Sequence, residues 1–113
     1  MIERSEFYLK TPDSREPLFL QRWKPQGPPD VTLLVTHGVA EHSECYHLMA
    51  EALASHRVEV YAWDLPGHGK SYGQRGYISS FDEFTGRLQF VLDEVKKITQ
   101  QKNPIVLFGH SLG

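Results

Sequence analysis

The last nine residues, Ile105-Val-Leu-Phe-Gly-His-Ser-Leu-Gly113, constrain the fold more than any other stretch of the chain. Four apolar residues run directly into Gly-x-Ser-x-Gly, a pattern typical of a buried strand that turns sharply into a helix. Glycines on both sides of Ser111 suit such a turn, because its backbone is strained and neighbouring segments approach closely. Ser111 is therefore the candidate nucleophile, and Gly109, His110 and Gly113 are predicted to support its turn.

A second candidate feature follows residues 31–36, the apolar run Val-Thr-Leu-Leu-Val-Thr. A run without alternation is typical of a strand buried on both faces of a parallel sheet. Acyl transfer needs two N–H groups directed at the developing oxyanion. Leu112, which follows the nucleophile, is predicted to supply one. Val39 is the candidate for the second, with Gly38 allowing the backbone to turn after His37.

Strands and helices are predicted to alternate before the Ser111 turn. Residues 3–24 are expected to form an antiparallel hairpin at the sheet edge, with strands over 6–10 and 18–23 around a turn of Pro, Asp and Ser. A helix is predicted from Ser43, its N-cap, with Tyr46, Met49 and Leu53 on one face at helical spacing. Another strand is predicted over 58–63. The predicted fold is α/β, with a mostly parallel sheet and an N-terminal antiparallel hairpin.

A longer helix is predicted from a capping box, Ser80-Phe-Asp-Glu83, to a stop at Asn103-Pro104. Its apolar residues fall on one stripe at helical spacing: Phe81, Phe84, Leu88, Val91, Leu92, Val95 and Ile98. The strand that follows, residues 105–108, is expected to have an open edge, and such edges pair with other chains or aggregate.

Composition excludes several classes of function. The net charge of −2 and the lack of a basic run argue against a nucleic-acid partner. The N-terminal residues do not resemble a secretory signal, and no apolar stretch approaches the ~20 residues of a membrane span. Cys45 is the only cysteine, so a cytoplasmic location is expected and its thiol is predicted to have only a packing role. No metal site is expected from the spacing of the histidines.

Four stretches together resemble one known family: Thr36-His-Gly-Val-Ala-Glu-His-Ser43, Asp64-Leu-Pro-Gly-His-Gly-Lys-Ser71, Gly73-Gln-Arg-Gly76 and Gly109-His-Ser-Leu-Gly113. The chain is similar to the monoacylglycerol lipase and lysophospholipase branch of the α/β-hydrolase superfamily, most clearly over residues 33–113. The resemblance implies a serine hydrolase of carboxylic esters, with a Ser-Asp-His triad, no cofactor, a lipid ester as substrate, and a helical lid that allows peripheral membrane association.

The resemblance also implies the roles of single residues. Ser111 is the nucleophile, and Val39 and Leu112 supply the oxyanion N–H groups. His37 and Gly38 shape the oxyanion loop, which Glu41 is expected to anchor from behind. Asp64 precedes the serine in the chain and is therefore expected to bind backbone in the Gly67–Gly69 loop instead of serving as the triad acid.

In this superfamily the acid and the histidine follow the nucleophile, so both are expected beyond residue 113. Residues 1–113 are accordingly predicted to be the N-terminal half of a single hydrolase domain, inactive without its C-terminal half. The identity of the acyl chain and head group depends on the lid. Alternatives left open are a small-molecule carboxylesterase, a proline-type aminopeptidase, and a non-catalytic scaffold or binding module.

Overall fold

Five strands form one mixed sheet in the computed structural model, which describes residues 2–10, 17–38, 41–72 and 81–110. The strands lie in the order β1-β2-β4-β3-β5. Their bounds are β1 (Glu3–Leu9), β2 (Leu18–Lys24), β3 (Val31–Thr36), β4 (Val58–Trp63) and β5 (Ile105–Gly109). β1, β2 and β4 pair in antiparallel fashion, whereas β3 pairs in parallel with both β4 and β5. The predicted α/β fold with an N-terminal hairpin is confirmed.

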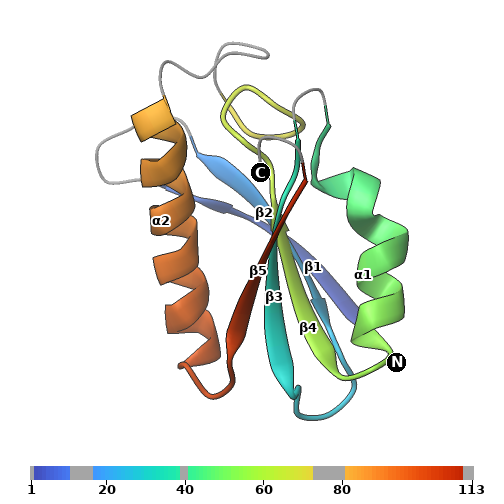
Figure 1. Cartoon of the computed structure of the whole chain (residues 1–113). Helices are drawn as coiled ribbons and strands as arrows, with labels where there is room; N and C mark the ends of the chain where they lie inside the picture. The colour runs from blue at the N-terminus through green and yellow to red at the C-terminus, as the bar shows by residue number, and fades with distance from the viewer. Residues whose placement is uncertain (1, 11–16, 39–40, 73–80, 111–113) are drawn as a thin grey trace.

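Helices cover the two faces of this sheet (Figure 1). The 3₁₀ helix η1 (Ser43–Tyr46) and α1 (His47–Ala54) lie on one face, and α2 (Phe81–Thr99) lies on the other. The α2 face is filled by a buried cluster of Leu18, Leu20, Leu34, Tyr61, Trp63, Leu65, Phe84, Val91 and Val95. The α1 face is filled by Trp23, Val35, Ala50, Ala54, Val60 and Ala62. Neither helix in the described ranges is long and apolar enough to cross a membrane.

A helical segment begins at Ser43 as predicted, but the predicted N-cap role of Ser43 is wrong. Ser43 begins a 3₁₀ turn and caps no helix, because its hydroxyl instead accepts a hydrogen bond from Gln21 Nε2 at 2.7 Å. Its backbone N–H donates to the carboxylate of Asp64. Tyr46, together with Met49 on the helix, packs against the α1-face cluster as the spacing predicted.

The second helix ends earlier than predicted. α2 stops at Thr99, because Gln100 and Gln101 have left-handed backbone conformations with φ of 56° and 53°. In the predicted stripe Phe84, Val91 and Val95 are buried and Leu88 and Leu92 are partly buried, but Phe81 and Ile98 at its two ends are exposed. The capping box stays a prediction, since Ser80 lies outside the described residues.

Two further expectations have different outcomes. Cys45 is exposed, so the predicted packing role of its thiol is wrong. The expectation of an open edge is confirmed, because within the described ranges β5 pairs with β3 alone.

Candidate active site

The carboxyl ends of β3 and β5 meet at one place on the sheet. The two strands pair in parallel with Thr36 opposite Gly109, and each strand ends at that residue. His37-Gly38 and His110 therefore leave the same edge of the sheet side by side. In α/β sheets the carboxyl edge is where ligands bind.

Several of the predicted site residues lie outside the described ranges. These are the candidate nucleophile Ser111, the candidate oxyanion donors Val39 and Leu112, and Gly113. Their roles stay predictions.

His37 is buried completely and binds backbone with both ring nitrogens. Nε2 accepts the N–H of Leu65 at 2.9 Å, so the ring proton must be on Nδ1. Nδ1 then donates to the carbonyl oxygen of Gly38 at 2.7 Å. The imidazole thus joins the loop after β3 to the loop after β4, and its tautomer is fixed by its two partners.

The environment of His37 keeps its ring neutral. Burial, the largest effect, lowers the pKa of His37, although the bond to Gly38 and the carboxylate of Asp64 act in the opposite direction. A second imidazole, that of His68, lies 5.2 Å away between ring centroids and also disfavours a charge on His37. Protonation would place a second N–H against the N–H of Leu65.

Glu41 links the loop after β3 to two other segments. Its Oε1 accepts hydrogen bonds from the N–H of Gly38 at 2.8 Å and from the hydroxyl of Tyr46 at 2.8 Å. Nδ1 of His110, the residue that follows the end of β5, lies 3.3 Å from the same oxygen. The bond from Gly38, followed by that from Tyr46, lowers the pKa of Glu41, so its carboxylate is ionised at neutral pH.

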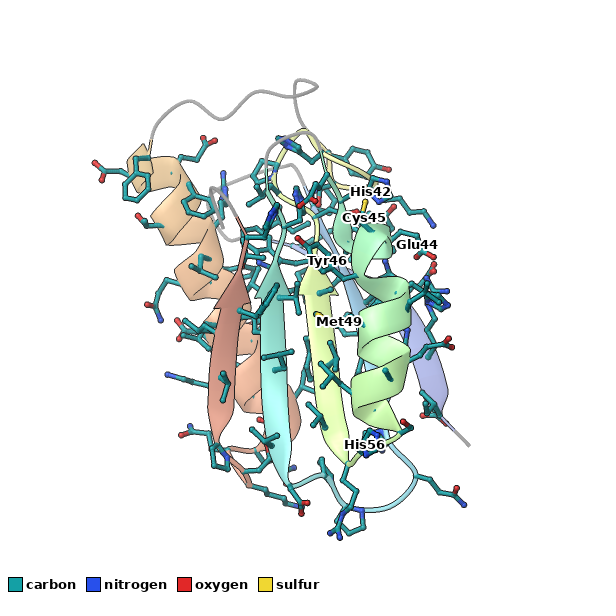
Figure 2. All side chains as sticks on the ribbon, turned by 45° about the vertical axis from the view of Figure 1, so that its right-hand side comes forward. His42, Glu44, Cys45, Tyr46, Met49 and His56 are labelled. Atoms are coloured by element: carbon teal, nitrogen blue, oxygen red, sulfur yellow. The ribbon has the colours of Figure 1, made fainter. Side chains whose placement is uncertain are left out.

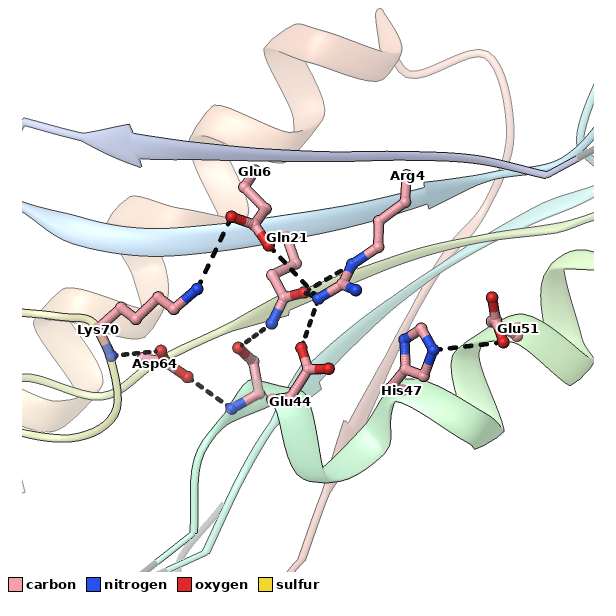
Figure 3. A network of polar contacts seen from close by, with 9 residues as sticks. Arg4, Glu6, Gln21, Glu44, His47, Glu51, Asp64 and Lys70 are labelled. Carbon is pink, nitrogen blue, oxygen red and sulfur yellow. Dashed lines mark hydrogen bonds and ion pairs between the residues drawn. The ribbon is translucent and has the colours of Figure 1, made fainter.

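The carboxylate of Asp64 forms hydrogen bonds that hold the loop after β4 (Figure 3). One carboxylate oxygen accepts the N–H of Ser43 and the other accepts the N–H of Lys70 at 2.8 Å. A Cβ at Gly69 would overlap this carboxylate, and φ there is +50°. Asp64 thus binds backbone as predicted, but at Lys70, directly after the Gly67–Gly69 loop, and at Ser43.

These observations agree with comparisons to known proteins. A family model described as "Serine aminopeptidase, S33" matches residues 27–113. The chain belongs to this α/β-hydrolase family. Human monoglyceride lipase is 38% identical over 96 residues, which cover 85% of this chain and 31% of that protein. Phospholipase YtpA of Bacillus subtilis is 32% identical over 91 residues, 80% of this chain and 34% of that protein. The chain spans about a third of the length of these relatives.

Solved structures show the same fold. A thermostable carboxyl esterase from Bacillus coagulans matches 100% of this chain and 38% of its own, with a TM-score of 0.83 and 21% identity. A soluble variant of monoglyceride lipase from Saccharomyces cerevisiae matches 95% of this chain and 36% of its own, with a TM-score of 0.80 and 19% identity.

Among the candidate site residues, the sequence predicted His37, Gly38, Glu41 and His110, and the structure brings these four together at one edge of the sheet. It missed Tyr46, which was read only as part of a helix face. Burial first, and then the bond to Glu41, raise the pKa of Tyr46 to about 12. The available signal was the hydroxyl itself, since a partly buried tyrosine hydroxyl usually has a hydrogen-bond partner.

Within the described ranges, no group of three or more His, Cys, Asp or Glu side chains is arranged to hold a metal ion. The exposed thiol of Cys45 lies on the outer side of η1 and not toward the end of β5 (Figure 2).

Proposed function

We propose that this chain carries the nucleophile of a serine hydrolase that cleaves carboxylic esters, with Ser111 as the attacking residue. The observation that supports this most directly is the pairing of Thr36 with Gly109. That pairing sets the start of the Gly-x-Ser-x-Gly turn beside His37-Gly38, where an oxyanion loop is required. We further propose that the triad acid and histidine follow residue 113.

The hydrogen bonds around Gly38 support an oxyanion role for the loop after β3. A trans peptide is planar, so its N–H is directed opposite to its carbonyl. A group that holds the Gly38 carbonyl would therefore also orient the next N–H in the chain, the proposed oxyanion donor. His37 holds this carbonyl, and the N–H of Glu41 donates to it as well at 3.2 Å. Two donors on one carbonyl oppose a peptide flip.

The reaction would proceed through an acyl-enzyme. Ser111 Oγ attacks the ester carbonyl while the proposed histidine takes its proton, and the same proton passes to the departing alcohol. The N–H groups of Val39 and Leu112 stabilise the oxyanion, each contributing about 3 kcal/mol to the transition state. Water then attacks the acyl-enzyme with the histidine again as base, which releases the acid and restores Ser111.

The substrate class we favour is a monoacylglycerol or a lysophospholipid. The 38% identity to human monoglyceride lipase supports the first, and the 32% identity to a phospholipase supports the second. The family description, serine aminopeptidase, favours a second candidate, hydrolysis of a peptide bond such as that of a proline-type aminopeptidase. A small-molecule carboxylesterase or a non-catalytic scaffold on the same fold would appear as distinct outcomes of the following test.

The test compares the protein that carries this chain with its Ser111→Ala variant. We expect covalent labelling by a fluorophosphonate probe and release of glycerol from a monoacylglycerol, both abolished by Ser111→Ala. Ser55→Ala is the matched control, because the Ser55 hydroxyl is exposed and only donates to the carbonyl of Ala52. Labelling that survives Ser111→Ala would contradict the nucleophile assignment. Turnover of an aminoacyl amide or of short esters alone would select the aminopeptidase or the carboxylesterase, and no labelling at all would select the scaffold.

A further inference from the structure

Oε1 of Glu41 is in contact with hydrogen-bond donors from three separate segments of the chain. Gly38 belongs to the loop after β3, Tyr46 ends η1, and His110 follows β5. An anchor for the Gly38 N–H needs only the first of these contacts. The bond from the Tyr46 hydroxyl to Glu41 requires a separate explanation, because it connects the loop after β3 to η1, which is packed on the sheet.

We propose that Tyr46 is a positioning residue of the active site, whose hydroxyl holds the Glu41 carboxylate in the orientation that fixes the Gly38 N–H. The inference rests on the proposed esterase function, since it matters for catalysis only if the following peptide N–H binds an oxyanion. Tyr46 itself would not touch the substrate. It would act through Glu41 and Gly38.

The exposure of Glu41 explains why a second donor is needed. The Glu41 side chain is 30% exposed, so water competes for its carboxylate, and a free carboxylate could turn away from Gly38. The hydroxyl of Tyr46 is the closer of the two side-chain donors, at 2.8 Å against 3.3 Å for His110. The His110 side chain is 63% exposed, whereas Tyr46 is half-buried. Tyr46 is therefore the donor that restrains the carboxylate.

The ring of Tyr46 is itself held firmly. It packs against the buried cluster on the α1 face and lies edge-on to Phe108, with ring centroids 6.0 Å apart and an interplanar angle of 73°. Figure 2 shows Tyr46 on the sheet side of η1, above Met49. Phe108 is the residue before Gly109, where β5 ends. Tyr46 therefore contacts the strand that leads to the nucleophile while it orients the loop that precedes the oxyanion donor.

Both partners keep the required protonation state at neutral pH. Burial and the bond to Glu41 raise the pKa of Tyr46 to about 12, so the hydroxyl remains a donor. The N–H of Gly38 and the hydroxyl of Tyr46 lower the pKa of Glu41, so the carboxylate remains an acceptor. The link therefore persists over the whole range in which an esterase would be assayed.

The chain offers a matched control for removing this hydroxyl. Tyr61 also donates its hydroxyl to a carboxylate, that of Glu59, but it lies in the cluster on the α2 face. Tyr46→Phe and Tyr61→Phe each remove one tyrosine-to-carboxylate bond and keep the ring. Only Tyr46→Phe removes a bond that leads to Gly38.

Two readouts test the inference in the protein that carries this chain. In a ¹⁵N–¹H spectrum, Tyr46→Phe is expected to shift the Gly38 amide upfield and to speed its hydrogen exchange, whereas Tyr61→Phe leaves both unchanged. In steady-state hydrolysis of a monoacylglycerol, Tyr46→Phe is expected to lower kcat about tenfold with KM within a factor of about two, as misplacement of one catalytic group predicts. Glu41→Gln, which keeps an acceptor oxygen without the charge, is expected to give an intermediate kcat and checks the link if Tyr46→Phe folds poorly.

The outcomes separate this inference from the proposed function. An unchanged Gly38 amide in Tyr46→Phe, or a loss of kcat no larger than that of Tyr61→Phe, would overturn the role of Tyr46 alone. Wild-type turnover no greater than that of Ser111→Ala would overturn the proposed function, and the catalytic role of Tyr46 with it. In that case the Gly38 amide would still report whether the physical link exists.

Discussion

β4 and β5 lie on the two sides of β3, and both pair with it in parallel. Both are apolar in sequence, Val-Glu-Val-Tyr-Ala-Trp in β4 and Ile-Val-Leu-Phe-Gly in β5. In β4 every residue after Val58 is buried, whereas in β5 every residue after Ile105 is exposed. Two strands of the same kind and with the same neighbour thus have opposite surroundings.

The difference comes from what packs around each strand. β4 lies between β2 and β3, and its side chains enter the clusters under both α1 and α2. β5 has β3 on one side only within the described part of the chain. Val106 and Leu107 are about half exposed, and Phe108 is 37% exposed although its ring contacts Tyr46. Apolar composition predicts a strand that can be buried, but its neighbours decide whether it is. The exposed surface of β5 therefore marks the place where we expect further polypeptide to pack in a complete hydrolase.

The largest effect is expected from truncating the buried strand. Trp63→Ala removes a fully buried ring and the bond from its Nε1 to Thr36 Oγ1, 2.9 Å long. A loss of about 3–5 kcal/mol is expected, a large part of the stability of a small domain. Leu107→Ala in β5 is the matched change and is expected to cost about 0.5 kcal/mol or less, because Leu107 is 54% exposed. Urea unfolding followed by circular dichroism measures both, and equal losses would break the comparison.

The second effect concerns the loop that follows the buried strand. Asp64→Asn replaces one acceptor oxygen by an NH₂ group, so one of the N–H groups of Ser43 and Lys70 loses its partner. An orphaned buried N–H costs about 1–3 kcal/mol, and the same loss is expected here. Asp93→Asn is the control, since Asp93 is exposed on α2 and its bond from Gln89 survives the change. A midpoint of unfolding equal to that of Asp93→Asn would show that Asp64 does not hold the loop.

Much of this fold was predictable because the information is local. The apolar run over 31–36 predicted β3, residues 58–63 were predicted as the strand that is β4, and the alternation of elements predicted the parallel pairing. The capping role of Ser43 was misread because the partners of Ser43 lie far away in sequence. Gln21 and Asp64 are each more than 20 residues away from Ser43. Gln21 binds the Ser43 hydroxyl, which a capping serine would direct at the helix, and Asp64 binds the Ser43 N–H. Local rules for capping carry no information about such partners.

The candidate site was predictable to a similar degree. His37 and Gly38 were found from their place directly after the apolar run over 31–36, and Glu41 was implied by the resemblance to the hydrolase family. The hydroxyl of Tyr46 was missed, because apolar spacing describes which side of a helix is buried and not where a polar tip is directed. The distances that connect these residues depend on the packing of η1 against β5, which only the folded chain supplies.

The third expected effect is on the pH dependence of folding stability, and it concerns His37 at the buried end of the site. The unfolded chain carries His37 with its ordinary pKa of 6.5, whereas burial lowers the pKa of His37 in the folded chain. The unfolded state therefore binds more protons below pH 6.5, and stability is lost as the pH falls through the lowered pKa. His37→Gln is expected to be less stable at pH 7 but to lose less stability between pH 7 and 5. The exposed His56→Gln is the control, and parallel profiles for wild type and His37→Gln would refute the assignment.

The smallest effect on stability, and the most direct test of the exposed strand, is expected from Leu107→Lys. Leu107 is 54% exposed on a strand whose outer edge has no partner among the described residues, so a lysine can extend into water at a cost within about 0.5 kcal/mol. The same charge opposes edge-to-edge pairing between chains. The 113-residue polypeptide is therefore expected to self-associate with rising concentration, and Leu107→Lys to remain monomeric, in sedimentation velocity. Ser55→Lys adds the same charge at an exposed position on the α1 side and controls for net charge. If Ser55→Lys suppressed association equally, repulsion between whole molecules, and not the open edge of β5, would explain the result.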